Sequence, residues 1–199
     1  MKAKLTLLLL CIPFISLFAK DIALNVSVFN EKIALPFVNS IIDEDIHPGI
    51  QLGVEFYHIN KSVFRLYQPI NLFVYYHANS FQGTTLGVTT EIAFALFIQS
   101  FFTELHLGAG YMHAFSTLAA STWNAATGRW ERNYFGRPGL LGNGSFGLGM
   151  DLREWKVPLK VYLRYTLGVF YAFQSSQLSP VVPISEIHLG VGYYLGEVN

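Results

Sequence analysis

Cysteine, charge and long hydrophobic runs are all scarce in this sequence. Its one cysteine, Cys11, lies in an N-terminal segment that we expect to be removed. The mature chain would then contain no disulfide, thiol nucleophile or thiolate metal site. Charged residues make up only 13% of the chain, whereas an ordinary soluble domain has about 25%. We therefore expect a surface that is not conventionally polar.

The sequence also lacks an excess of charge of either sign. Lysine plus arginine number 13, and aspartate plus glutamate number 13. This balance excludes a strongly basic protein, so we predict no nucleic-acid partner. Beyond the N-terminal segment no apolar run reaches the 18 residues typical of a membrane helix. The nearest stretch, 92–102, is short and is interrupted by Gln99 and Ser100.

The N-terminal segment has the layout of a secretory signal peptide. Lys2 and Lys4 precede an apolar run that ends near Ala19. We expect residues 1–19 to be the signal peptide and residues 20–199 to be one mature domain. A lipoprotein would need a small residue before Cys11, and Leu10 is large.

What the rest of the chain has in abundance is period-two alternation of apolar and polar residues. This pattern is typical of β-strands with two different faces. Eight segments show it, the first of them weakly, and they span 22–29, 49–57, 63–77, 85–96, 101–115, 145–151, 159–169 and 186–193. We therefore predict an all-β fold of about eight strands.

The connections between these segments alternate between short and long. Short ones lie near 60–61, 99–100 and 153–158, and longer ones span 30–48, 78–83, 116–141 and 174–183. Bacterial membrane barrels have short periplasmic turns and longer external loops. The alternation predicts a transmembrane up-and-down antiparallel β-barrel with both ends of the mature chain in the periplasm.

Glycine placement indicates which face lies inside this barrel. Small residues are useful where side chains crowd a narrow lumen, and nine glycines share the charged face: Gly53, Gly87, Gly108, Gly110, Gly147, Gly149, Gly168, Gly190 and Gly192. On the apolar face, aromatic residues gather near the strand ends, as in interfacial girdles: Phe56, Tyr76, Tyr111, Phe115, Tyr171, Phe173 and Tyr193. We predict that the charged face lines the lumen. A soluble periplasmic ligand-binding barrel with an apolar cavity remains an alternative.

Two motifs accompany this architecture, His47-Pro48-Gly49-Ile50-Gln51-Leu52-Gly53 and Phe135-Gly136-Arg137-Pro138-Gly139. With them the chain resembles an uncharacterised branch of the small outer-membrane β-barrel proteins of Gram-negative bacteria. The resemblance implies a location in the bacterial outer membrane. It also implies three kinds of partner, namely outer-membrane lipid, lipopolysaccharide and the barrel-assembly machinery.

Inside the predicted barrel, strand parity gathers ten polar residues into a lumen network. They are Glu55, Arg65, Glu91, Glu104, His106, Asp151, Lys160, Arg164, Glu186 and His188. Buried charges persist only when they are paired, so we expect ion pairs and hydrogen bonds. A metal site built from His106, His188, Glu104 and Glu186 has suitable ligands, but nothing in their spacing singles it out. We predict no metal site and no cofactor.

The enzyme alternative is a lipid A deacylase, an activity known among small barrels of this kind. It would need a histidine and a serine on one face of a strand. The nearest pairs are His77 with Ser80 and His113 with Ser116, and a separation of three residues sends the two side chains to opposite faces. We therefore predict no catalytic residues, although a bulge would restore the parity.

The long segment 116–141 holds the most distinctive exposed chemistry. It contains Trp123, Arg129, Trp130, Arg132 and Tyr134. Arginine forks suit phosphate and sugar groups, and aromatic residues often anchor binding sites. We predict a non-enzymatic envelope protein, structural or interacting, whose external loops bind lipopolysaccharide or a surface partner.

Overall fold

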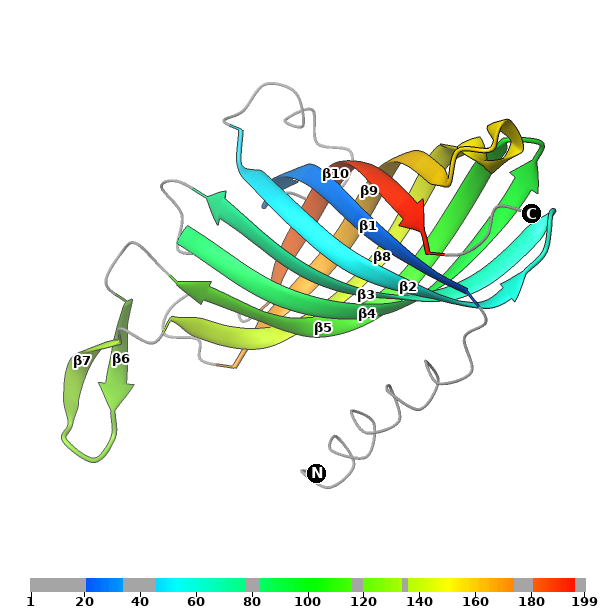
Figure 1. Ribbon diagram of the computed structural model, residues 1–199. Coiled ribbons are helices and arrows are strands. Elements are labelled where there is room, and N and C mark those ends of the chain that lie inside the picture. The colour runs from blue at the N-terminus through cyan, green and yellow to red at the C-terminus, as the bar shows by residue number, and fades with distance from the viewer. Residues whose placement is uncertain are drawn as a thin grey trace.

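The chain closes into an antiparallel barrel of eight strands (Figure 1). The computed structural model describes residues 21–33, 46–77, 83–115, 120–133, 136–173 and 181–195. The barrel strands are β1 (Asp21–Lys32), β2 (Pro48–Asn60), β3 (Phe64–His77), β4 (Gly83–Ile98), β5 (Phe101–Phe115), β8 (Arg137–Asp151), β9 (Leu159–Ala172) and β10 (Val181–Tyr194). Each pairs with its neighbours in the chain, and β1 pairs with β10 to close the barrel. The predicted fold class is confirmed as an eight-stranded antiparallel barrel.

Alternation along each strand separates an apolar outer face from a mostly polar inner face. In β4, for example, buried and exposed positions alternate along almost its whole length. Leu52, Leu105, Leu163 and Leu189 all lie on the outside, with exposed fractions of 54, 57, 54 and 63%. The prediction that the charged face lines the lumen, with the apolar face outside, is therefore confirmed.

The two ends of the barrel differ in their connections. Residues 61–63, 99–100 and 152–158 form short links at one end, and the last of these includes the 3₁₀ turn η2 (Leu152–Trp155). Asp151 caps this turn, because its carboxylate accepts a hydrogen bond from the Arg153 backbone N–H at 3.1 Å. The longer connections lie at the opposite end, where a separate hairpin projects from the barrel (Figure 1). These two ends are called the turn end and the loop end below.

The hairpin is the main departure from the predicted pattern. Segment 116–141, which we expected to be a loop, contains strands β6 (Ala120–Asn124) and β7 (Arg129–Asn133), paired with each other. Gly128 lies in their turn with a φ of +62°, a backbone conformation that favours glycine. The end of the same segment belongs to β8, which begins at Arg137 instead of near Ser145.

Two further predictions concern chain segments at the boundaries. The expected loop 174–183 ends earlier, because β10 begins at Val181 and Pro183 pairs with Val169. The predicted signal peptide, residues 1–19, lies outside the described residues. No helix in the described part of the chain is long and apolar enough to cross a membrane.

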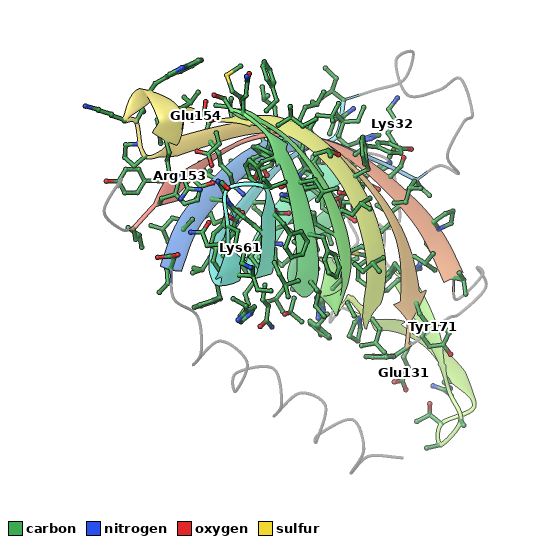
Figure 2. The ribbon with its side chains drawn as sticks, turned by 90° about the vertical axis from the view of Figure 1, so that its right-hand side faces the viewer. Lys32, Lys61, Glu131, Arg153, Glu154 and Tyr171 are labelled. Carbon is green, nitrogen blue, oxygen red and sulfur yellow. The ribbon has the colours of Figure 1, made fainter. Side chains whose placement is uncertain are left out.

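Aromatic side chains fill the interior near both ends. At the turn end Tyr57 and Tyr67 stack at a centroid distance of 4.8 Å. At the loop end Phe29, Phe73 and Phe170 belong to a second buried cluster. Many charged residues are buried in the same interior, and Figure 2 shows side chains filling the space that the ribbon encloses.

Inner-face glycines make room for this filling. A Cβ atom on Gly87 would lie 2.1 Å from Phe73 Cζ, and one on Gly190 would lie 2.3 Å from Tyr162 Cζ. Both distances are far below van der Waals contact. The expectation that these glycines face a crowded lumen is therefore confirmed.

Candidate functional site

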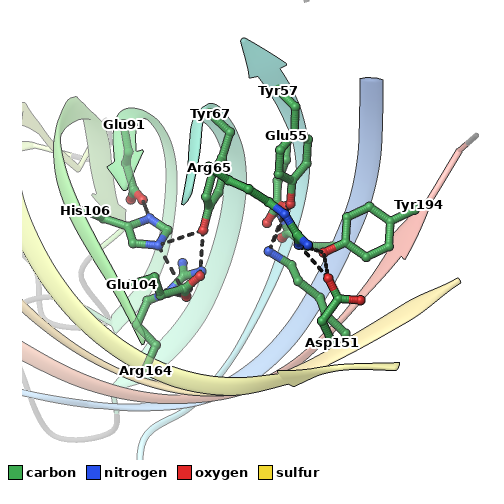
Figure 3. Close-up of polar contacts among 12 residues, drawn as sticks. Glu55, Tyr57, Arg65, Tyr67, Glu91, Glu104, His106, Asp151, Arg164 and Tyr194 are labelled. Carbon is green, nitrogen blue, oxygen red and sulfur yellow. Dashed lines mark hydrogen bonds and ion pairs between the residues drawn. The ribbon is translucent and has the colours of Figure 1, made fainter. Parts of the chain in front are cut away.

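The middle of the lumen is organised around Glu104. Arg164 donates to Glu104 Oε1 from Nε at 3.0 Å and from Nη2 at 2.9 Å, while Tyr67 Oη donates to Glu104 Oε2 (Figure 3). The residues come from β5, β9 and β3, so the contacts cross the barrel interior. Their side chains are all buried, and each charge has a partner.

His106 links Glu104 to a second carboxylate. Its Nε2 lies 3.2 Å from Glu104 Oε1, and its Nδ1 lies 2.8 Å from Glu91 Oε2. Because ionised carboxylates only accept hydrogen bonds, this geometry fits a ring that donates from both nitrogens, as an imidazolium does. Asn143 donates to the other oxygen of Glu91 at 2.8 Å. With Arg164, this group contains two negative and two positive charges.

Two more ion pairs lie towards the turn end. Lys160 Nζ is 2.8 Å from Glu55 Oε2, and Tyr57 Oη donates to the same oxygen at 2.7 Å. Arg65 pairs with Asp151 at 2.5 Å. Tyr194 Oη also donates to Asp151, at 3.2 Å. Figure 3 shows Glu55, Arg65 and Asp151 beside the Glu104 cluster.

Asp151 also receives a second arginine from the 3₁₀ turn. Arg153 Nη2 lies 2.9 Å from Asp151 Oδ2. Partial burial alone would lower the pKa of Arg153, but the hydrogen bonds to the Asp151 carboxylate outweigh it and raise this pKa. The guanidinium also lies 3.7 Å from the centroid of the Tyr194 ring, so the turn end is closed by a tightly packed ionic cluster.

Towards the loop end, His188 pairs with Glu186 at 2.9 Å and stacks on Phe29. A cavity of about 20 Å³ lies between these residues and the Glu104 cluster, lined partly by Glu91, Arg164 and His188. A single water needs roughly 10–15 Å³ of such volume. The cavity therefore has room for one water, and not for a solute.

All ten residues of the predicted lumen network lie inside the barrel, but they do not form the metal site that we considered. His106 contacts Glu91 and Glu104, whereas His188 contacts Ser27 and Glu186. The two histidines belong to separate groups.

Sequence analysis missed a third group at the loop end, formed by Glu31, His47 and His77. It is the one set in the described part of the chain where three side chains offer ligand atoms within 4.8 Å of one another. Glu31 ends the inner face of β1, His47 immediately precedes β2, and His77 ends β3. The sequence singled out His47 as part of a motif and His77 as part of a histidine–serine pair, but it did not connect them with Glu31. The Glu31–His77 contact spans 46 residues and becomes visible only once β1, β2 and β3 are in register.

In segment 116–141, the structure describes the backbone of the β6–β7 hairpin and only some of its side chains. Trp123 and Trp130 occupy opposite positions in the β6–β7 ladder, and Arg129 is exposed. The side chains of Trp123, Trp130 and Arg132 are outside the description, and Tyr134 lies outside the described residues. Whether these side chains bind a partner stays a prediction.

The two histidine–serine pairs considered for a deacylase differ in position. His77 lies at the loop end of the barrel, where its Nδ1 contacts Glu31 Oε2 at 2.8 Å. His113 is half-buried on the outer side of β5, beside Tyr111 and Phe115. Ser80 and Ser116 lie outside the described residues, so the predicted parity of these pairs stays untested.

No protein-family model matches this sequence, and no curated protein is similar enough in sequence to count as a match. Several solved structures are distantly similar in fold. They include Neisserial surface protein A, with 11% identity and a TM-score of 0.48 over 87% of this chain and 95% of that protein. The outer-membrane enzyme PagL has 12% identity and a TM-score of 0.48, over 86% of this chain and 98% of PagL. The attachment invasion locus protein Ail of Yersinia pestis, in complex with sucrose octasulfate, has 13% identity and a TM-score of 0.44, over 88% of this chain and 97% of Ail. The chain is thus distantly similar in structure to small outer-membrane β-barrels.

Proposed function

We propose that this protein spans the bacterial outer membrane as a plugged β-barrel and interacts with the envelope or its surroundings through its loop end. One observation carries the proposal: the barrel is apolar outside and charged inside. Within the eight barrel strands every aspartate, glutamate, lysine and arginine is buried or half-buried. Large hydrophobic side chains are exposed on every one of these strands.

This distribution is the reverse of what water favours. Exposed apolar patches on soluble monomers rarely exceed a few hundred Å², whereas here the apolar surface surrounds the whole barrel. Hydrocarbon is the solvent in which such a surface is stable, and the closed barrel pairs its backbone groups without an exposed edge. A soluble barrel that carries an apolar ligand would need the opposite arrangement, with the apolar face inside.

Strand length also supports a spanning barrel. A transmembrane β-strand needs about 9–11 residues at a tilt of roughly 45°. The barrel strands have between 12 and 16 residues. Outward aromatic residues lie near the strand ends, including Tyr76, Tyr111 and Tyr171 at the loop end and Tyr193 at the turn end, where headgroups would meet them.

The filled lumen favours a structural or interaction role over solute transport. Tyr57, Tyr67, Lys160, Arg164 and Glu104 are each almost fully buried within it. Ion pairs cross the barrel from β9 to β2 and β5, and the Tyr67 hydroxyl donates a hydrogen bond from β3 to β5. Passage of a solute would require these pairs to separate in a medium where unpaired charges are costly.

The orientation follows from the connections. With the short links in the periplasm, the loop end faces outwards and presents the β6–β7 hairpin with exposed Arg129 and Glu131. We propose this hairpin as the binding surface for lipopolysaccharide or a surface partner. The proposed role is non-enzymatic.

Cell fractionation combined with gel electrophoresis tests the location. We expect the mature chain in the outer-membrane fraction, with migration in detergent gels that changes on heating because the folded barrel resists unheated detergent. Recovery as a soluble periplasmic monomer would overturn the proposal.

Two assays of the purified protein test the proposed role. In planar bilayers we expect no stable single-channel currents, and with lipid A we expect no deacylated product by mass spectrometry. Stable currents would contradict the plugged lumen, and deacylation would contradict the non-enzymatic role.

A further inference from the structure

We propose that Glu31, His47 and His77 form a binding site for a divalent transition-metal ion of the zinc class at the loop end of the barrel. Glu31 lies on β1, His77 lies on β3, and His47 immediately precedes β2, the strand between them in the barrel. One ligand atom from each lies within 4.8 Å of the other two. The inference depends on the barrel geometry and not on the membrane location.

His47 is held in place by three hydrogen bonds to the end of β1. Its backbone N–H donates to Asn30 Oδ1 at 2.7 Å, and its carbonyl accepts from the Glu31 backbone N–H at 3.0 Å. Its ring Nδ1 lies 3.1 Å from the Glu31 backbone carbonyl. A carbonyl only accepts, so Nδ1 carries the proton, and the neutral ring keeps a lone pair on Nε2. Metal-ligating histidines commonly donate their second ring N–H in this way.

Glu31 supplies a buried carboxylate with unused capacity. The residue is fully buried, and its Oε1 has no hydrogen-bond partner. Its Oε2 lies 2.8 Å from His77 Nδ1. A buried polar atom without a partner is costly, and a bound cation would satisfy it. The Glu186 carboxylate also interacts electrostatically with Glu31, which adds negative potential at the site.

The two imidazoles are already adjacent. The rings of His47 and His77 stack with a centroid distance of 3.5 Å and an interplanar angle of 12°. A tetrahedral zinc site, with bonds of about 2.0–2.1 Å, places its ligand atoms roughly 3.3 Å apart. Since the ligand atoms lie within 4.8 Å of one another, no separation would need to shorten by more than about 1.5 Å to reach this geometry.

The ligand set determines the class of metal. Two imidazoles and one carboxylate suit zinc and its transition-metal neighbours, whereas calcium and magnesium prefer oxygen ligands. Three protein ligands leave a fourth position for water or for a group presented from outside. With His47 and His77 both slightly exposed, an ion can reach the site from the loop end.

The test is calorimetric titration of the purified, detergent-folded protein with Zn²⁺ alone. We expect one Zn²⁺ per chain, and an affinity that falls at least about tenfold in Glu31→Gln, His47→Ala and His77→Ala, since even an outer-shell partner is worth 10–100-fold. His113→Ala, on the outer face near the same end, is the control and should bind as the native protein does. Ca²⁺ and Mg²⁺ should not compete.

Heat-modifiable migration shows whether each variant is folded, and Glu31→Gln keeps the volume of the native side chain if an alanine variant fails to fold. Co²⁺ provides an independent readout, because a four-coordinate site absorbs visible light much more strongly than hydrated Co²⁺. Unchanged Zn²⁺ affinity in the folded ligand variants, equal loss in His113→Ala, or a Co²⁺ spectrum like that of the hydrated ion would overturn the proposal.

Discussion

Glu104 shows how single residues make this lumen stable. Its carboxylate accepts from Arg164 and Tyr67 and also contacts His106, while burial removes it from water. Bringing so many charges together in a narrow space is favourable only if they neutralise one another. The network therefore depends on each partner being present.

Replacement of this glutamate by the neutral Glu104→Gln should destabilise the barrel. It leaves Arg164 and His106 with a single carboxylate, Glu91, between them, and removal of one partner from a buried pair costs about 3 kcal/mol or more. Urea titration of the folded gel band measures the change. Glu131→Gln alters an exposed residue of the hairpin and should change stability by less than about 0.5 kcal/mol. Equal stability of the two variants would show that the lumen charges are dispensable.

Part of this residue-level picture is accessible from sequence. Strand parity alone places Glu104, Arg164 and His106 on one face, because alternation is a local property. It does not pair them, since Glu104 and Arg164 are 60 positions apart and meet only when β5 and β9 curve around the same lumen. For the same reason the Glu31, His47 and His77 group is invisible before the register of β1, β2 and β3 is known.

At the scale of elements, glycines determine how closely the strands and their side chains pack. Gly87 leaves space for the Phe73 ring on the neighbouring strand β3, whereas a Cβ on Gly142, on the outer face of β8, would meet nothing within 4 Å. The two glycines therefore have different roles in similar strands.

Alanine substitution separates these roles. Gly87→Ala should destabilise the folded barrel by about 1–3 kcal/mol through overpacking. Gly142→Ala should be neutral or slightly stabilising, because alanine restricts the unfolded chain. Unfolding in urea compares the two directly. A larger loss at Gly142 would place the crowded face on the outside.

The hairpin β6–β7 is the element that sequence analysis did not anticipate. Its strands are only five residues each, too short for convincing alternation, although Gly128 supplies the turn signal. The sequence also did not predict that β8 begins as early as Arg137, because alternation is lost at the start of that strand. Leu140 and Leu141 are both apolar, and Gly142 and Gly144 bring small residues to the outer face, so the period-two pattern is lost there.

Removal of this hairpin should leave the barrel intact. Ala120 and Asn133 are ladder partners, so a short glycine–serine link can replace the residues between them without straining the barrel. We expect normal heat-modifiable migration and weaker binding to lipopolysaccharide in surface plasmon resonance. A charge-reversed Arg129→Glu variant, with the hairpin kept, should also bind more weakly. Undiminished binding by both would exclude the hairpin as the binding surface.

At the scale of the whole molecule, the inversion of polarity determines what the protein is suited to do. The outer face, exemplified by Leu163 with 54% exposure, carries leucine, valine, isoleucine and phenylalanine around the circumference, while adjacent Arg164 is buried in the lumen. This inversion was foreseeable, because nine glycines share the strand parity of the charged residues, although Gly142 and Gly144 do not. The central claim is that the outer face contacts lipid.

Nitroxide accessibility in lipid vesicles tests this claim most directly. A label at Leu163→Cys, on the outer face of β9, should be relaxed strongly by oxygen, which partitions into hydrocarbon, and weakly by a water-soluble nickel chelate. The same label at Lys61→Cys, exposed in the short link between β2 and β3, should show the opposite preference. Strong relaxation of the Leu163→Cys label by the nickel chelate, equal to that at Lys61→Cys, would contradict the proposed membrane barrel.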